Sequence, residues 1–410
     1  MDEFLQNLEE AKKRDHRKLG RELDLFCFSE KVGPGLPLFS PRGTFILETL
    51  KKKVEKICRK FGFQKISTPH FAKIDLYKIS GHAEKFSGEL FKVDGHYKTK
   101  YCVKPVQCPH HTQIFASKMR SHKDLPIRYM ESEKQYRDEK PGQIGGLGRV
   151  IAITVEDGHI FCTPEQIEIE CKNLVKIIRE FYDSLGMWGN HWVSLSTRDK
   201  KNFKKYIGKK SDWEKAEKFL EKICVDEKLD AKKMPGEAAL YGPKIDFMFR
   251  DAIGNERQLA TIQLDFATPQ RFELEYIDKN GEKKIPVMIH RAILGSYERF
   301  LAILIEHFAG NFPLFLSPTQ LAILPITKKH ENFAQKILEK IQKSGGRAEI
   351  FSADETLGKR ILNFQKQKIP LAAILGDAEI SENFLSIRAR GSKKMQKFSL
   401  EKLIEKLTKN

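Results

Sequence analysis

Three features that often reveal a function are missing from this 410-residue sequence: paired cysteines, long apolar runs and glycine-rich phosphate loops. The seven cysteines include no Cys-x-x-Cys pair, which argues against a disulfide framework or a four-cysteine zinc ribbon and favours a reducing compartment. No stretch has the apolar core of a signal peptide or a membrane span, so we predict a cytoplasmic protein without membrane contact. Neither a Gly-x-x-x-x-Gly-Lys-Ser/Thr loop nor a Gly-x-Gly-x-x-Gly turn after a strand is present, so a bound nucleotide must be held by arginines.

Basic residues dominate what is present. Lysine and arginine total 73 against 55 aspartates and glutamates, a formal net charge of +18. Clustered cations release counterions when they meet phosphates, so this excess favours a polyanionic partner. A lysine-rich surface that serves only solubility explains the charge equally well. The length exceeds the size at which one hydrophobic core stops growing, so we expect two domains.

Residues 1–314 are predicted to form the larger domain, of the α+β class. Apolar residues at helical spacing predict amphipathic helices over 44–61 and 163–185. Strand patterns recur at residues 91–93, 101–104, 127–136, 149–155, 245–249 and 258–266. The segments between them are mostly too short to hold crossover helices, so we expect a mixed, mainly antiparallel sheet.

Residues 315–410 are predicted to form a second, smaller α/β domain. Two prolines and a serine between Asn311 and Pro318 mark the boundary. The pattern beyond it alternates strand and helix, which predicts a largely parallel sheet. Residues 321–410 contain 18 Lys plus Arg and 10 Asp plus Glu, a net charge of +8, so this domain is a candidate nucleic-acid module.

Cys108, His159 and His290 are candidate metal ligands, because each follows or ends a strand-like run and three strand ends can converge. One sulfur and two imidazoles suit zinc, and three protein ligands leave a fourth position open. Taken singly, a lone cysteine is more often a small buried hydrophobe and a lone histidine a hydrogen-bonded core residue. His110 and His111 compete as ligands.

Arg137 and Arg149 flank a turn-forming KPGQIGG sequence, and a hairpin there would bring both guanidinium groups onto one surface. Arginine suits phosphate because its planar fork makes two parallel hydrogen bonds and stays charged. Glu139 cannot bind phosphate but can accept a hydrogen bond from an exocyclic amine. A surface hairpin with paired charges is the alternative. Arg299 enters an apolar helix, where an arginine needs an anionic partner.

Taken together and in this order, these motifs resemble those of the class II aminoacyl-tRNA synthetases and, among them, of the threonyl-tRNA synthetases. The helix and strand ending at Pro69 are similar to motif 1, YRDE with the loop to Arg149 to motif 2, and GSYERF to motif 3. The segments CPHHTQIF, VEDGHIFC, PVMIHRAILGS, ALYGPKIDF and TIQLDF match the threonyl enzymes. The resemblance extends from about Asp15 to the end of the chain.

The resemblance implies ATP-dependent activation of threonine to threonyl-adenylate and its transfer to tRNA(Thr). Arg137 and Arg299 would be the catalytic residues. The ATP-binding set would be Arg137, Glu139, Arg149, Gln258, Thr261 and Arg299, with Mg²⁺ accompanying the ATP. Catalysis would then consist of positioning and electrostatic stabilisation. The alternative reading is a non-catalytic paralogue that binds RNA or regulates.

For the amino acid, the resemblance implies one Zn²⁺ per chain on Cys108, His159 and His290, which would take the amino and hydroxyl groups of threonine. Asp157 would accept a hydrogen bond from that hydroxyl, and Tyr241 and Gln263 would line the pocket. A valine isostere would leave polar groups unsatisfied, whereas serine lacks only a methyl group and should be rejected by only about 1–3 kcal/mol. Family members carry an editing region before the stretch at which this sequence begins, so we expect no cis editing.

The resemblance also implies a homodimer formed through residues 44–69 and anticodon contacts from Glu379 and Arg388. The sequence departs from the family pattern at His110, Ile151, Ile153 and Val155, so adenine would pack against aliphatic side chains. Leu362 replaces an arginine in the smaller domain. We expect Lys359 and Arg360 to be close enough to compensate.

Overall fold

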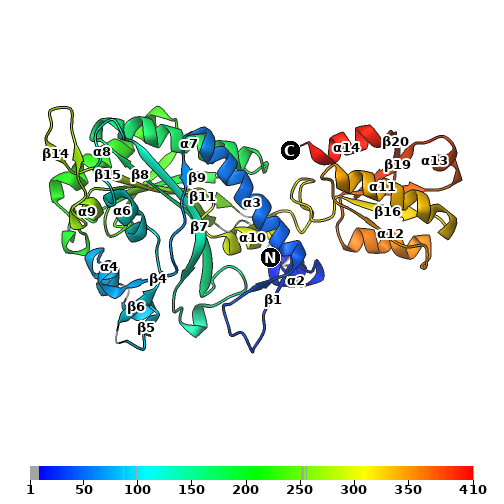
Figure 1. The fold of residues 1–410 in the computed structure, drawn as a ribbon, viewed down its shortest axis with the longest axis horizontal. Helices are drawn as coiled ribbons and strands as arrows, with labels where there is room; N and C mark the ends of the chain where they lie inside the picture. The colour runs from blue at the N-terminus through cyan, green and yellow to red at the C-terminus, as the bar shows by residue number, and fades with distance from the viewer. Residues whose placement is uncertain are drawn as a thin grey trace. The chain divides into compact units, whose positions relative to one another are not determined.

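The structure is a computed structural model that describes residues 9–409 apart from 86, 98, 190, 251–253 and 255. The chain divides into two compact units (Figure 1). The larger unit comprises Phe28–Pro37 and Lys51–Ala302. The smaller unit comprises Leu38–Leu50, Ile303 onward and the residues before Phe28. No helix among the described residues is long and apolar enough to cross a membrane.

An eight-stranded sheet forms the centre of the larger unit, with the strand order β10-β9-β11-β12-β15-β8-β7-β3. The strands are β3 (Gln64–Lys65), β7 (Ile127–Tyr136), β8 (Ala152–Cys162), β9 (His191–Thr197), β10 (Ala231–Pro235), β11 (Lys244–Arg250), β12 (Glu256–Asp265) and β15 (Val287–Ala292). The outermost pairs, β10–β9 and β3–β7, are parallel, and the pairs between them are antiparallel. The predicted α+β domain with a mixed, mainly antiparallel sheet is confirmed.

Helices cover both faces of this sheet. On one face, Tyr182 of α7 (Ile167–Asp183) stacks on Phe249 of β11 with ring centroids 3.9 Å apart. On the other face, Phe115 of α6 (Cys108–Ala116) stacks on Phe161 of β8 at 4.6 Å. Thr163 makes a capping box with Gln166 ahead of α7, which satisfies N–H groups at the helix start. The candidate metal ligand Cys108 belongs to α6 and therefore lies on the face that this helix covers.

Apart from α8 (Lys210–Asp226), which is as long as α7, the remaining elements of the larger unit are short. They are β4 (Phe71–Lys73), α4 (Ile74–Ile79), α5 (His82–Lys85), β5 (Lys92–Asp94), β6 (Lys100–Val103), the 3₁₀ turns η2 (Pro141–Gln143) and η4 (Phe203–Lys205), α9 (Ala267–Arg271), β13 (Tyr276–Ile277) and β14 (Lys283–Lys284). Strands β13 and β14 pair antiparallel and form a hairpin that turns at Asn280-Gly281. Two helices contribute to both units, α3 (Pro41–Lys60) and α10 (Tyr297–His307).

The smaller unit contains a five-stranded sheet with the order β17-β16-β18-β19-β20. Strands β16 (Leu321–Pro325), β17 (Ala348–Ile350) and β18 (Leu371–Leu375) are parallel, as predicted, whereas β19 (Leu385–Ala389) and β20 (Met395–Phe398) are antiparallel. Apolar residues of α11 (Glu331–Lys343) and α14 (Leu400–Thr408) pack on one face. Those of α12 (Leu357–Lys366) pack on the other. The short helices are α2 (His16–Glu22), which precedes hairpin β1 (Phe26–Cys27)–β2 (Leu38–Phe39), and α13 (Asp377–Ser381).

Candidate functional site

Neighbouring strands of the large sheet place a row of polar side chains on the face covered by α6. The register pairs Tyr129 of β7 with His159 of β8, His159 with His290 of β15, His290 with Gln263 of β12, and Gln263 with Lys244 of β11. Side chains on a strand alternate between faces with a period of two, so directly paired residues share a face. Residues far apart in sequence are thereby brought into one line.

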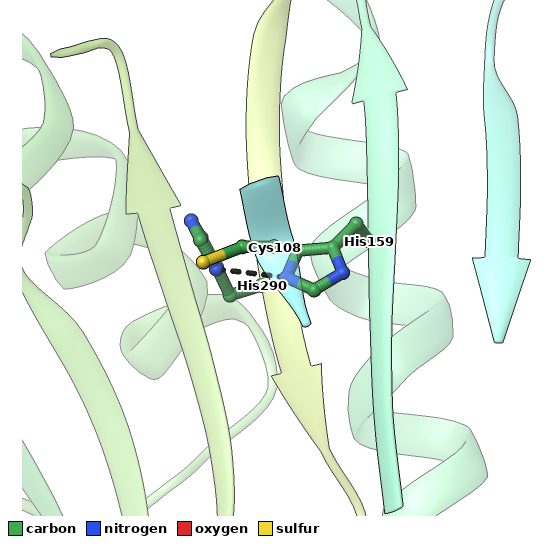
Figure 2. Close-up of side chains that lie close together, drawn as sticks. All are labelled: Cys108, His159 and His290. Atoms are coloured by element: carbon green, nitrogen blue, oxygen red, sulfur yellow. Dashed lines mark hydrogen bonds between the residues drawn. The ribbon is translucent and has the colours of Figure 1, made fainter. Parts of the chain in front are cut away.

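The candidate metal ligands meet within this row (Figure 2). Ligand atoms of Cys108, His159 and His290 all lie within 4.8 Å of one another, and all three residues are buried. His159 Nε2 is 3.0 Å from His290 Nδ1. The prediction that three strand ends converge was wrong in detail, because Cys108 opens helix α6 while both histidines lie within strands.

In each imidazole, the ring nitrogen that faces away from the cluster has a hydrogen-bond partner, which fixes the orientation of the ring. Asp265 Oδ2 lies 2.9 Å from His290 Nε2, so this nitrogen carries the proton and Nδ1 keeps its lone pair. His159 Nδ1 lies 2.7 Å from His111 Nδ1, and His111 Nε2 lies 3.3 Å from Glu131 Oε2. His111 therefore donates to Glu131 and accepts from His159, which leaves the lone pair of His159 Nε2 directed at His290.

The protonation states fit a metal. Burial lowers the pKa of His159 well below its ordinary value, so its imidazole is neutral, as coordination requires. Burial, together with the nearby Asp157 and Asp265 carboxylates, raises the pKa of the Cys108 thiol well above its ordinary value. A thiolate can form there only if a cation offsets this cost. One sulfur and two neutral imidazoles are a donor set that zinc prefers.

The competing histidines are not part of this cluster. His111 lies behind His159, as described above, and acts on the cluster only through that residue. His110 is buried against the ring of Tyr77, with centroids 6.1 Å apart. Burial lowers the pKa of His110 to about 4, so it contributes no charge near neutral pH.

A group of guanidinium groups lies in the β7–β8 hairpin and at the start of α10. Arg137 is held by the backbone, since its N–H donates to the carbonyl of Ile151 across the hairpin. Arg149 donates to Glu139, with Nη2–Oε2 2.7 Å, which is the paired-charge arrangement that sequence reasoning kept as the alternative. Arg299 is exposed and donates to the carbonyl of Gly148 at 3.0 Å.

Arg299 forms no ion pair with any carboxylate that the structure describes, although its position in an apolar helix led us to expect an anionic partner. Although the side chain keeps contact with solvent, the protein around it desolvates the guanidinium group and lowers its pKa, and the positive charges of Arg257, Arg149 and Arg137 lower it further. The charged groups that act on Arg299 are thus three other guanidinium groups and the Glu139 carboxylate, an excess of positive over negative charge around this side chain. Such an excess suits a polyanion such as a triphosphate.

A β-bulge brings together two residues that a regular strand would keep apart. Gln258 and Thr261 are an odd number of positions apart, so they would point to opposite faces of β12. The register between β11 and β12 shifts at Phe247/Met248, and Gln258 Nε2 lies 3.1 Å from Thr261 Oγ1. Both donate to Asp246 Oδ1 at 2.8 Å, and Lys244 Nζ lies 2.6 Å from Asp246 Oδ2. Sequence reasoning missed Asp246.

The predicted amino-acid pocket residues surround the metal cluster. The ring of Tyr241 stacks on that of His290 with centroids 4.8 Å apart. Gln263 is buried and donates to the carbonyl of Gly242. Asp157 Oδ1 lies 3.9 Å from His159 Nε2, and burial raises the pKa of this carboxyl. Gly242 permits this packing, because a Cβ there would lie 1.6 Å from the carbonyl oxygen of Leu264.

A cavity of about 240 Å³ opens between Arg137 and Tyr241. It is also lined by His82, Glu89, Pro105 and Leu240, among others. His82 is buried and burial lowers its pKa to about 4, so it is neutral near pH 7. Sequence reasoning missed His82, and no local motif marks it, since only the fold brings the segment after α4 beside Tyr241.

Comparisons with known proteins find relatives of both parts of the chain. The description "tRNA synthetase class II core domain (G, H, P, S and T)" matches residues 91–308, and "Anticodon binding domain" matches residues 320–410. The threonine--tRNA ligase of Synechocystis sp. is 43% identical over 411 residues, which cover 99% of this chain and 68% of that protein. The solved RNA-binding domain of threonyl-tRNA synthetase from Cryptosporidium parvum Iowa II superposes with a TM-score of 0.91 at 34% identity, over 96% of this chain and 98% of that one.

The chain belongs to the threonyl-tRNA synthetase family. Another relative, the threonine--tRNA ligase of Gloeobacter violaceus, is 45% identical over 395 residues. These cover 95% of this chain but 63% of that protein, so the chain spans slightly under two thirds of its length.

The anticodon positions expected from this family lie in the smaller unit. Glu379 on α13 accepts from Ser386 at 2.6 Å and from the N–H of Gly376 at 2.9 Å. Arg388 on β19 shares a face with Ser386 and donates to the carbonyl of Ser392. This face is opposite the one that buries Leu385 and Ile387 against α11 and α14.

The expected compensation for Leu362 by Arg360 is wrong. Arg360 is 2% exposed and donates to the backbone carbonyls of Pro325, Ile326, Phe351 and Glu355, so it stabilises the fold and cannot reach a ligand. Lys359 is exposed but forms an ion pair with Glu355. Leu362 itself is 48% exposed and presents an apolar surface.

Replacing Asp265 by asparagine should weaken metal binding by about 10- to 100-fold, because the partner that fixes the His290 tautomer is lost. Chelator competition with purified protein would measure this affinity. Asp278→Asn is a matched control, since Asp278 also accepts backbone N–H groups but lies in the β13–β14 hairpin. Equal affinities for the two variants would contradict the role given to Asp265.

Proposed function

We propose that this chain activates threonine with ATP and transfers it to tRNA(Thr), as a threonine--tRNA ligase. The observation that carries the proposal is the cluster of Cys108, His159 and His290, which lies in the same unit as Arg137, Arg149 and Arg299. Relatives named threonine--tRNA ligase that match 95% or more of the chain support the same activity. The lack of other phosphate-binding loops makes the arginines the candidate ATP site.

In the activation step, the threonine carboxylate would attack the α-phosphorus of ATP and displace pyrophosphate. Arg137 would contact the α-phosphate and hold the carboxylate, while Arg149 and Arg299 would bind the terminal phosphates. Mg²⁺ bound to the ATP would offset further negative charge. Glu139 would accept from the adenine amine once a phosphate competes for Arg149. Gln258 and Thr261, held by Asp246, would line the nucleotide side. Such positioning and electrostatics suffice for phosphoryl chemistry of this kind.

Selection of threonine would depend on the metal cluster. Cys108, His159 and His290 would hold one Zn²⁺, which when bound would supply open coordination positions for the amino and hydroxyl groups of the amino acid. Asp157 would accept the hydroxyl hydrogen bond, and Tyr241 and Gln263 would line the rest of the pocket. Valine lacks the hydroxyl and would leave Asp157 unpaired in a buried setting, which costs orders of magnitude in selectivity.

We also propose which domains the chain contains, which partners it binds and where it is located. We assign the catalytic domain to residues 1–314 and the anticodon-binding domain to residues 315–410, where Glu379 and Arg388 would contact the tRNA. A homodimer would form through residues 44–69. The seven unpaired cysteines, most of them buried, favour a reducing compartment such as the cytoplasm.

Replacing Cys108 by serine should remove the zinc and the threonine-dependent ATP–pyrophosphate exchange together. We expect a loss of more than about 100-fold in kcat/KM for threonine, since even partners behind metal ligands cost 10- to 100-fold. Cys102→Ser, at a buried cysteine outside the cluster, is the matched control. Exchange activity that persists without zinc would show that the metal is incidental. No exchange by the unmodified chain with threonine, serine or valine would favour a non-catalytic role.

Replacing Arg388 by alanine should lower kcat/KM for tRNA(Thr) in aminoacylation by about 5- to 150-fold, which corresponds to about 1–3 kcal/mol for a base contact. ATP–pyrophosphate exchange should be unchanged, because activation needs no tRNA contact at the anticodon. Lys336→Ala removes one charge from α11, which packs on the opposite face of the sheet, and should leave both activities intact. An equal effect of both substitutions would count against anticodon contact by Arg388.

A further inference from the structure

The segment from Lys200 to Lys210 is the most basic stretch of the larger unit that the proposed site leaves unexplained. It contains six lysines and no acidic residue within eleven positions. All six lysines are exposed, and none forms an ion pair with a residue that the structure describes. They are Lys200, Lys201, Lys204, Lys205, Lys209 and Lys210. Some lysines elsewhere in this unit do pair with carboxylates, as Lys222 does with Glu168 and Lys233 with Glu221. Six exposed lysines that pair with no described carboxylate create a positive surface potential, which attracts an anion.

Aromatic side chains fix this segment to helix α8, which carries Trp213. The ring of Tyr206 lies 4.8 Å from that of Trp213, and Phe203 contacts both rings. Trp213 Nε1 donates to the carbonyl of Ile207 at 2.8 Å. The hydroxyl of Tyr206 accepts from the N–H of Asp199 at 2.9 Å. The lysines are therefore carried by a backbone that is tied down on both sides, which lowers the entropic cost of binding.

The same segment borders the candidate pocket. The N–H of Ile207 donates to the carbonyl of Leu240 at 2.9 Å, and Leu240 and Tyr241 line the cavity with Arg137. On the other side, a Cβ at Gly81 would lie 3.2 Å from Ile207 Cδ1, and the next residue, His82, lines that cavity. The basic segment thus forms part of the rim around the cavity that Arg137 and Tyr241 line, and Tyr241 in turn stacks on His290 of the metal cluster.

We propose that the Lys200–Lys210 segment binds the phosphodiester backbone of the RNA strand whose 3′ end enters this cavity. The proposal rests on the proposed function, which requires an RNA end to reach the activated amino acid. Lysine is a flexible point charge without directional demand, which suits a continuous backbone that differs in conformation from one phosphate to the next. The triphosphate of ATP is the other anion available, but the group of arginines already matches it, and six lysines exceed its charge.

The decisive variant is the triple substitution Lys204→Gln, Lys205→Gln and Lys209→Gln in the full chain. The RNA probe is a hairpin that carries the tRNA acceptor stem and its single-stranded 3′ end, so that anticodon contacts do not mask the effect. We expect Kd for this hairpin, measured by fluorescence anisotropy, to rise at least about tenfold at low salt. The slope of log K against log salt should become shallower by about 2, since each lost phosphate contact contributes about 0.7. Lys→Arg at the same positions should restore binding.

A matched control is Lys118→Gln, Lys123→Gln and Lys279→Gln, which removes the same charge from exposed lysines around the β13–β14 hairpin. Equal weakening by both triple variants, or no weakening by either, would overturn the proposal in favour of a solubility role. A raised KM for ATP in pyrophosphate exchange would also overturn it and assign the lysines to the triphosphate.

If the unmodified chain exchanges pyrophosphate but does not bind the hairpin, this proposal fails while threonine activation stands. If it binds the hairpin without exchange, the proposed catalytic function fails instead.

Discussion

The direct pairing of His159 with His290 across strands β8 and β15 is the constraint on which the rest of the site depends. A slip of one residue in this register would move one imidazole to the face covered by α7 and leave Cys108 with only one imidazole partner. The pairing of β15 with β12 sets Gln263 beside His290. Asp157 lies two residues before His159 on β8 and therefore shares its face. The hairpin that continues β7 into β8 then carries Arg137 and Arg149, so the positions of amino-acid and phosphate ligands are set by one sheet.

Burying the cluster without a bound ligand costs free energy of folding, and the groups around the cluster limit this cost. Burial disfavours charge on His159 and on Cys108, and it therefore favours a neutral His159 imidazole and a protonated thiol. Glu131 is the buried carboxylate at the end of the hydrogen-bonded chain that runs from His159 through His111. Burial raises its pKa, but hydrogen bonds and charges from His111, Lys104 and Thr68 outweigh this and hold the pKa below its ordinary value. An ionised Glu131 fixes the proton of His111, and through it that of His159, without placing a net charge at the cluster.

The sequence predicted the mixed sheet of the larger unit, the parallel part of the smaller sheet and the amphipathic helices over 44–61 and 163–185, because apolar periodicity reports burial directly. It also identified Cys108, His159 and His290, although it placed them at strand ends, since periodicity does not reveal where α6 begins. It could not reveal Asp246 or Asp265, whose roles come from a bulge in β12 and from the register with β15. Arg360 was misjudged for a related reason: proximity in sequence to Leu362 says nothing about a guanidinium group that four backbone carbonyls hold inside the domain.

The central claim is that one sulfur and two imidazole nitrogens form a zinc site that selects the amino acid. X-ray absorption at the zinc edge on protein purified with zinc tests it most directly. We expect one zinc per chain, with one sulfur at about 2.3 Å, two nitrogens at about 2.0–2.1 Å, and the remaining coordination changed by added threonine but not by valine. A shell of oxygen ligands alone, more than one sulfur, or an identical spectrum with and without threonine would contradict the account.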